Sequence, residues 1–93
     1  MIRSFRCSDT QKIWEGFFVK KFPKEIQNRA LLKLRQLNAA ITVADLRLPP
    51  SNHLESLKGD RSGQYSIRIN VQWRICFEWV NNDAINVEIV DYH

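Results

Sequence analysis

The chain is short and basic: it has 93 residues, a net charge of +4, 44% hydrophobic residues and 11% aromatic residues. This apolar content is too high for a disordered segment. We therefore expect one folded domain over residues 1–93, near the lower size limit for independent folding. A small basic domain suits an acidic partner, and RNA, DNA and acidic proteins all fit this description.

Membrane, secretory and metal-binding classes are disfavoured. No apolar run approaches the ~20 residues of a membrane span, and the first ten residues lack the apolar centre of a signal peptide. The two cysteines, Cys7 and Cys76, lie far apart, and the two histidines, His53 and His93, have no metal-ligand spacing. We expect a cytoplasmic protein with reduced cysteines, no metal and no cofactor.

Two helices are predicted in the first half of the chain, after a short edge strand at residues 1–5. Ser8 and Gln11 fit a capping box that opens the first helix. The apolar face of this helix comprises Ile13, Trp14 and Phe17. Pro23 suits the first turn of the second helix. The buried stripe of that helix comprises Ile26, Ala30, Leu34, Leu37 and Ile41, and is widened by Leu31.

Basic residues accompany the second helix and lie mainly off its apolar stripe. On the helix itself they are Lys24, Arg29, Lys33 and Arg35. Two interpretations are open for them: an ordinary solvated helix face, or an electrostatic surface for ribosomal RNA or an acidic partner.

The second half of the chain predicts an antiparallel meander. Two prolines in the loop at residues 48–52 end the helical character. Apolar and polar residues then alternate in three runs, at residues 65–70, 73–79 and 85–90. The predicted fold class is therefore α+β, with two N-terminal helices packed on one face of a small antiparallel sheet.

The alternation also predicts the register, because the apolar positions must share one face. The predicted pairs are Ile69 with Trp73, Arg68 with Arg74, Trp79 with Ile85, and Arg74 with Val90. The face away from the helices is then expected in solvent. Its side chains are Arg68, Arg74, Glu78, Glu88 and Tyr92.

Two guanidinium groups opposed on this face suggest an anion site. Arg68 and Arg74 repel one another unless acidic neighbours or a bound anion relieve them. Guanidinium binds phosphate through two N–H groups and stabilises charge that builds up at phosphorus. Lys58 and Arg61 lie in a glycine-containing turn from which they can reach over the sheet. A face of salt bridges is the alternative.

The sequence ends in three proton-handling residues, Asp91, Tyr92 and His93. Histidine can accept or donate a proton near neutral pH, and the other two side chains can orient it. Metal-free RNA cleavage needs a base for the ribose 2′-OH, cations at phosphorus and an acid for the 5′ oxygen. The alternative is a frayed terminus without function.

Four segments together resemble HigB-type toxins of the RelE/ParE superfamily: MIRSF, LKGDRSGQYSIRIN, QWRICFEW and VEIVDYH. They follow one another at the family's spacing over nearly the whole chain. The resemblance implies a microbial-ribonuclease-like fold and ribosome-dependent cleavage of mRNA in the A site. It also implies neutralisation by a HigA-like helix-turn-helix antitoxin, with DNA contacted only through that antitoxin.

The resemblance and the charge pattern together name the candidate residues. The family's C-terminal Asp-Tyr-His, strand arginine and lysine before Gly-Asp match Asp91, Tyr92, His93, Arg74 and Lys58. The candidate catalytic residues are His93, Tyr92, Asp91, Arg74 and Glu55. The candidate RNA-phosphate ligands are Lys58, Arg61 and Arg68. The candidate ribosome-docking surface is Lys20, Lys21, Lys24, Arg29 and Lys33.

One position departs from the family pattern. Some relatives have a catalytic histidine three residues before the lysine, where this chain has Glu55. Glu55 can act as the base only if burial raises its pKa. Otherwise His93 works alone or activity is weaker. We expect little from His53, which in a strand would point to the opposite side from its neighbours.

Two other functions are open within the same superfamily. One is a non-catalytic module that retains antitoxin binding and autoregulation. The other is a ParE-like gyrase poison with the same scaffold and no nuclease chemistry, since fold alone does not separate these activities. The terminal Asp91-Tyr92-His93 favours the nuclease, because a gyrase poison has no use for it.

Overall fold

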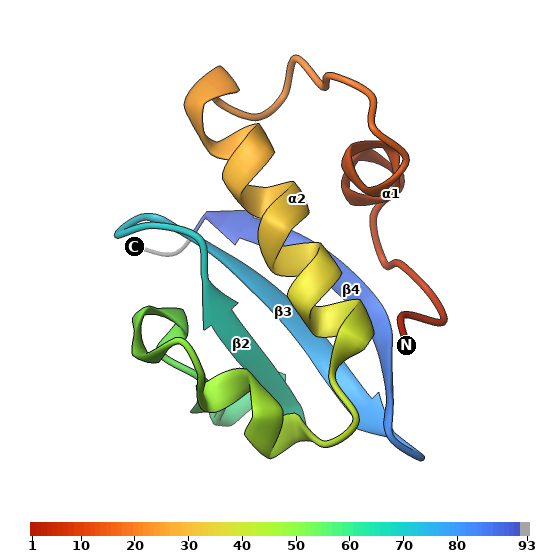
Figure 1. Ribbon diagram of the computed structural model, residues 1–93, viewed down its shortest axis with the longest axis vertical. Coiled ribbons are helices and arrows are strands. Elements are labelled where there is room, and N and C mark those ends of the chain that lie inside the picture. Colours follow the sequence, from red (N-terminus) through yellow and green to blue (C-terminus); the bar gives the residue numbers. More distant parts are fainter. Residues whose placement is uncertain (92–93) are drawn as a thin grey trace.

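Two helices cover one face of a four-stranded sheet. The computed structural model describes residues 1–91, so Tyr92 and His93 lie outside the described residues. The main elements are α1 (Ser8–Trp14), α2 (Lys24–Ala39), β1 (Glu55–Ser56), β2 (Gln64–Arg68), β3 (Trp73–Val80) and β4 (Asp83–Asp91). The strands are antiparallel in the order β1-β2-β3-β4, and α1 and α2 lie on the same side of them (Figure 1). The predicted α+β fold is confirmed.

The longer helix, α2, packs its predicted apolar stripe toward the sheet. The buried members, at most 2% exposed, are Ile26, Ala30, Leu34 and Leu37. Pro23 directly precedes the first helical residue, close to the position predicted for it. The helix ends at Ala39, and Ile41 beyond it is 72% exposed. Including Ile41 in the stripe is therefore wrong, because the helical period stops two residues before it.

The shorter helix, α1, begins without the predicted capping box. Cys7 occupies the N-cap position, and no side chain caps the helix there. Ser8 is already the first helical residue, so its hydroxyl is one position too late to cap. The Thr10 hydroxyl accepts a hydrogen bond from the backbone N–H of Ile89 at 3.0 Å. This buried contact ties α1 to β4.

The N-terminal segment lies along the outer edge of β4. In place of the predicted edge strand, it makes two isolated parallel bridges, Ile2 with Ala84 and Phe5 with Val87. Backbone hydrogen bonds of 2.8 to 3.1 Å accompany both bridges. The first residues of the chain therefore shield a strand edge that would otherwise expose unpaired backbone groups.

Asp83, at the start of β4, fixes this segment further. The amino group of Met1 lies 3.2 Å from its Oδ1, and Arg3 Nε donates to its Oδ2 at 3.0 Å. The hydrogen bond from Arg3, with a smaller contribution from the terminal amine, holds the pKa of Asp83 below its usual range.

The predicted register is confirmed around Arg74. This residue lies opposite Arg68 on one side and opposite Val90 on the other. The backbone N–H of Ile69 donates to the carbonyl of Trp73 at 2.9 Å, as the predicted pairing requires. Three adjacent strands therefore bring Arg68, Arg74 and Val90 into one row across the sheet.

The register predicted at the far end of the second hairpin is wrong by one residue. Trp79 pairs with Ala84 rather than with Ile85. A β-bulge absorbs the difference, and Asn86 within it has a left-handed φ of 53°. The backbone N–H of Asn86 donates to Ser4 Oγ at 2.8 Å. The N-terminal segment thus supplies a partner that strand alternation cannot reveal.

The apolar core lies between the helices and the sheet. The sheet contributes Ile67, Ile69, Ile75, Phe77, Val87 and Ile89 to it. Within residues 1–91, neither helix combines the length and the apolar character that a membrane span requires.

Candidate functional site

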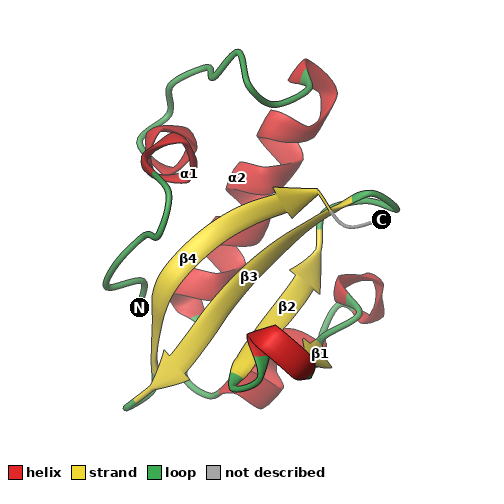
Figure 2. Cartoon of the chain, turned by 180° about the vertical axis from the view of Figure 1, so that it is seen from behind, coloured by secondary structure: helices red, strands yellow, loops and turns green. Residues whose placement is uncertain are grey.

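The sheet face opposite the helices is covered at its centre, so the prediction that Arg74 lies in solvent is wrong, whereas Arg68, Glu78 and Glu88 are partly exposed. Figure 2 views the sheet from this side. Ser66 and Cys76 are 0% exposed, and Arg74 is 7% exposed. The chain from His53 to Arg61 supplies the groups that contact this face. Polar side chains here are therefore enclosed between the sheet and a connecting segment.

Arg74 is the centre of this covered face. Its Nε donates to Ser66 Oγ at 2.9 Å, and its Nη2 donates to the backbone carbonyl of His53. Its Nη1 lies 3.3 Å from Glu55 Oε1. The guanidinium of Arg74, a residue of β3, thus contacts β1, β2 and the segment before β1. A guanidinium held on several sides keeps one orientation, which a flexible surface arginine does not.

Glu55 is the exposed partner of this ion pair. It lies in the two-residue strand β1, and its side chain is 51% exposed while that of Arg74 is 9% exposed. The burial that would favour Glu55 as a base is therefore missing. The structure does bring together these two candidate catalytic residues, which lie 19 positions apart in the sequence. Their contact presents a carboxylate to solvent directly beside a fixed cation.

Arg61 reaches over the sheet, as predicted, but it is already engaged there. Its Nη1 lies 2.8 Å from Glu88 Oε1 of β4 and donates to Gln64 Oε1 at 3.1 Å. Lys58, at the N-cap of the short 3₁₀ helix Gly59–Arg61, is exposed. Of these two candidate phosphate ligands, Lys58 therefore lies in solvent, and Arg61 holds the cover over Cys76.

Arg68 lies beside Arg74 and is more accessible. Its Nε donates to the carbonyl of Asn70 at 3.1 Å, and it is intermediate in exposure. Within residues 1–91, Arg68 makes no ion pair, whereas Arg74 is paired with Glu55. Glu55 thus offsets the positive charge of Arg74, but no acidic side chain among the described residues is paired with Arg68, so the repulsion between the two arginines is relieved only in part.

Asp91 ends the described part of the chain at the same end of the sheet. It lies opposite Trp73, and its Oδ2 accepts a hydrogen bond from Gln72 Nε2 at 3.2 Å. Its neighbour Val90 lies opposite Arg74. The candidate residues Tyr92 and His93 follow directly but lie outside the described residues. The end of β4 therefore lies next to Arg74 in the sheet, and Arg74 is paired with Glu55.

His53 is not part of a strand, so the reason given for discounting it is wrong. It follows the short 3₁₀ helix Pro50–Asn52 with a left-handed φ of 44°. Its side chain is exposed, and its carbonyl is held by Arg74. Such a backbone conformation persists in a non-glycine residue where surrounding contacts maintain it.

Asn52 and Ser66 position this corner, and sequence patterns did not single them out. Asn52 is 0% exposed and its Nδ2 donates to the carbonyls of Leu46 and Leu48 at 3.1 and 3.2 Å. Its Oδ1 accepts a hydrogen bond from Lys33 Nζ. The predicted register could have identified Ser66, because Ser66 lies on the same sheet face as Arg68 and opposite Cys76. No sequence pattern predicts that an asparagine such as Asn52 is buried and anchors a loop.

The predicted basic surface loses one member. Lys20, Lys21, Lys24 and Arg29 are exposed, but Lys33 is 8% exposed and bound to Asn52. Burial, with a smaller effect from the charge of Arg29, lowers the pKa of Lys33. Assigning Lys33 to a docking surface is therefore wrong, because the residue is buried and its amine is bound to Asn52.

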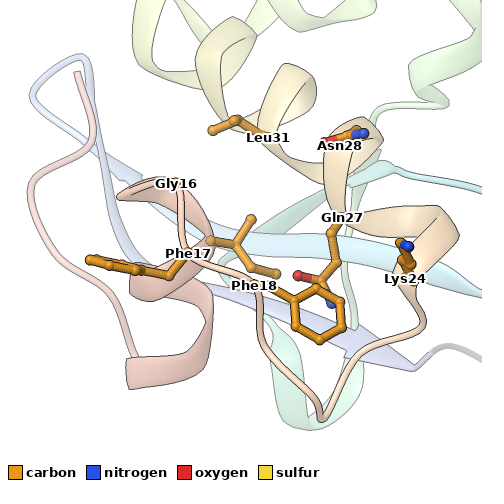
Figure 3. A pocket seen from close by; sticks show the side chains of 8 residues that line it. Gly16, Phe17, Phe18, Lys24, Gln27, Asn28 and Leu31 are labelled. Carbon is orange, nitrogen blue, oxygen red and sulfur yellow. The ribbon is translucent and has the colours of Figure 1, made fainter.

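An apolar pocket of about 180 Å³ lies between α2 and the loop after α1. Phe17 and Phe18 come from this loop, and Lys24, Asn28 and Leu31 come from α2 on the other side (Figure 3). The two phenylalanines are 63% and 61% exposed. Placing Phe17 on the apolar face of the first helix is wrong, because α1 ends at Trp14.

The loop carrying these phenylalanines is held by Gln27 of α2. Gln27 Oε1 accepts the backbone N–H of Val19 at 3.0 Å, and its Nε2 donates to the carbonyls of Val19 and Phe22 at 2.6 and 3.0 Å. Gln27 is itself buried. The exposed aromatic pair therefore lies on a fixed backbone.

Comparison with known proteins agrees with this architecture. The family model described as "RelE-like toxin of type II toxin-antitoxin system HigB" matches residues 4–93. Toxin HigB-1 of Vibrio cholerae serotype O1 is 45% identical over 64 residues, which are 69% of this chain and 67% of that protein. Endoribonuclease HigB of Proteus vulgaris is 31% identical over 93 residues, which are 100% of both chains.

Solved structures show the same fold in more distant proteins. A chain of the YoeB–YefM complex from Staphylococcus aureus superimposes with a TM-score of 0.62, covering 100% of this chain and 98% of that one. The sequence identity is 17%, so this likeness concerns the fold alone. The match of the family model over nearly the whole sequence is decisive: the chain belongs to the RelE-like HigB toxins of type II toxin–antitoxin systems.

Proposed function

We propose that this toxin is a ribosome-dependent endoribonuclease of the cytoplasm that cleaves mRNA in the A site without a metal ion. The observation that carries the proposal is the corner where Arg74 forms an ion pair with Glu55 and lies opposite Val90, the residue before Asp91. The Proteus vulgaris relative, matched over its full length, is named an endoribonuclease.

The proposed reaction is attack of a ribose 2′-OH on the neighbouring phosphorus. A base takes the 2′-OH proton, the 2′ oxygen bonds to phosphorus, and the bond to the 5′ oxygen breaks. An acid gives that oxygen a proton, so the products are a 2′,3′-cyclic phosphate and a 5′-OH end. His93 is the proposed proton carrier, with Tyr92 and Asp91 orienting it, because imidazole titrates near the pH of the cell.

Arg74 and Glu55 have distinct proposed roles. Arg74 is almost fully buried, and its contacts keep Glu55 and the His53 carbonyl in place. It therefore contributes a fixed positive charge toward the phosphate, which stabilises negative charge without reorganisation. Glu55, with half of its side chain exposed, lacks the burial that a base would need, and its proposed role is to hold the Arg74 guanidinium in place.

Ribosome docking is proposed for the exposed cations near the start of α2. They are Lys20, Lys21, Lys24 and Arg29, without the buried Lys33. Phosphate contacts by such side chains release counterions, so binding weakens steeply as salt rises. Lys58 and Arg68, at the corner itself, are the proposed cations for the mRNA strand.

The proposed partner is a HigA-like helix-turn-helix antitoxin, through which alone DNA is contacted. The pocket with Phe17 and Phe18 supports this partner, because paired exposed aromatics flanked by lysines suit an amphipathic segment with acidic residues. An occupant there covers Lys24, part of the proposed docking surface. Phe18→Asp is expected to prevent neutralisation by co-expressed antitoxin while toxicity remains; neutralisation as in wild type would move the docking face elsewhere.

The test of the function is induced expression in bacteria with mapping of mRNA 5′ ends. We expect growth arrest with new 5′-OH ends inside reading frames for wild type and for the surface control Arg35→Ala, and neither effect for His93→Ala. Arrest without new ends would indicate a gyrase poison. A protein that causes no arrest would be a binding and autoregulatory module.

A further inference from the structure

A second cationic feature lies beside the proposed catalytic corner. It is a shallow cavity of about 250 Å³ between α2, the loop before β1 and the turn after β2. Arg29 lines it from α2, His53 from the loop, and Arg68 from the end of β2, with Asn70 and Val71 on the turn. None of the residues that line it in the described chain is acidic.

No ion pair among the described residues neutralises the arginines around this cavity. Within residues 1–91, neither Arg29 nor Arg68 forms an ion pair, although six ion pairs occur elsewhere in that range. The Nε of Arg68 is bound to the carbonyl of Asn70, which limits the movement of its guanidinium. In the described part of the chain, two arginines and a histidine from three separate elements thus surround a space without a counter-charge, which favours an anion there.

The backbone geometry holds this cavity open. His53 is in the left-handed conformation, and its carbonyl is bound by Arg74. The preceding residue, Asn52, is fully buried and bonded to α2 through Lys33 and Gln36. The histidine is therefore presented from an anchored loop. Preorganised donors bind a phosphate without the cost of ordering a mobile segment.

We propose that the cavity formed by Arg29, His53 and Arg68 is a subsite for an mRNA phosphate other than the one that is cleaved. This inference rests on the proposed nuclease function. RNA is the ligand because the cavity shares His53 with the Arg74 cluster, so a strand at the catalytic corner continues into it. Val71, 84% exposed at the rim, offers an apolar contact for a ribose or base.

The experiment is binding of a labelled 2′-O-methyl oligoribonucleotide, which cannot be cleaved through its 2′ oxygen, by fluorescence anisotropy at several salt concentrations. Arg29→Ala and Arg68→Ala are each expected to weaken binding about tenfold, as loss of a charged hydrogen bond does. Each should also reduce the slope of log K against log[salt] by about 0.7, the value for one phosphate contact with a single strand.

The matched control is Arg35→Ala, an exposed arginine of the same helix that does not line the cavity. His53→Ala tests the loop wall, and thermal unfolding of each variant shows whether the fold is kept. Binding by the cavity variants equal to that of Arg35→Ala would overturn the proposal. So would binding of inorganic phosphate, followed by amide shifts of Asn70 and Val71, if the oligonucleotide caused no such shifts.

The two proposals fail in different ways. Because the oligonucleotide is not cleaved, weaker binding by the cavity variants would support the subsite even if expression produced no mRNA cleavage in cells. Cleavage in cells with unchanged oligonucleotide binding would refute the subsite and leave the nuclease intact. If an acidic peptide competed at the cavity while the oligonucleotide did not bind, the ligand would be a protein and the proposal would be wrong.

Discussion

Both faces of the sheet bury side chains at their centre, yet the two faces are built from different chemistry. On the helix side, Ile67, Ile75 and Phe77 are 0% exposed and pack against α1 and α2. On the other side, Ser66 and Cys76 are equally buried, and Arg74 is nearly so. The first face is held by apolar contact. The second is held by polar groups that each find a partner, and no buried side-chain polar atom of the described residues is left unsatisfied.

The difference lies in what covers each face. In a helix that covers a sheet, apolar residues recur with a period of 3.6, and in the strand beneath it they recur with a period of 2. Both sides of this contact can therefore be predicted from a sequence. The segment from His53 to Arg61 has no such period. It covers the second face through single contacts, such as the pair of Arg61 with Glu88. The alternation of polar residues along a strand therefore predicts which sheet face they share, but not whether that face is exposed to solvent.

The largest expected effect is the loss of a central side chain from either face. Phe77→Ala should cost about 3–5 kcal/mol of unfolding free energy, because it leaves a cavity in the apolar core. Arg74→Met, which keeps most of the volume, should cost about 2 kcal/mol by leaving Ser66 and the His53 carbonyl without a donor. Urea unfolding measures both.

Arg74→Met should also abolish toxicity, whereas Phe77→Ala should reduce it only in proportion to the folded fraction. If Arg74→Met proved as stable as Arg35→Ala, the second face would be open in solution, and the comparison between the two faces would fail.

A smaller effect concerns the two cysteines, of which Cys76 lies under the polar cover and Cys7 is partly exposed. Burial raises the pKa of Cys76, so little reactive thiolate forms there at neutral pH. We expect iodoacetamide to label Cys7 first and Cys76 roughly a thousandfold more slowly, through opening of the fold. Mass spectrometry of timed samples measures both rates. Equal rates would mean that the segment over Cys76 opens locally.

The smallest expected effect is at the outer edge of β4. The pKa of Asp83 is lowered in the folded state by Arg3 and the terminal amine. Its contribution to stability is therefore complete above the ordinary aspartate pKa of about 3.9, and is lost as pH falls through the lower folded value. Asp83→Asn should flatten that part of the stability curve. Unchanged acid unfolding in this variant would show that the exposed pair contributes nothing.

Much of the fold follows from the sequence, and particular residues show why some of it does not. Alternation fixed Arg74 opposite Arg68 and Val90, because a shift of one residue would turn the apolar side chains outward. It failed at Trp79, where Asn86 inserts a bulge supported by Ser4. A residue more than eighty positions away supplies that support, beyond the reach of any local pattern.

The candidate site, like the fold, could be predicted from the sequence only in part. Glu55 and Arg74 do meet, as their shared assignment predicts, but the sequence gives no sign that Arg74 is enclosed. In the sequence, Lys33 cannot be distinguished from the exposed basic residues of α2, yet it is buried and its amine donates a hydrogen bond to Asn52. Helical position separates apolar from polar residues; it does not tell which long polar side chain turns inward to serve a loop.

The pairing of Ile2 and Phe5 with β4 has a consequence for the order in which the molecule is assembled. The segment with Ile2 and Phe5 is synthesised about eighty residues before its partners Ala84 and Val87, so it has no pairing partner until β4 is made. A nascent chain cannot close this edge or seat the bulge at Asn86 until β4 emerges. This edge of the sheet is therefore completed late in folding, only after β4 has been made.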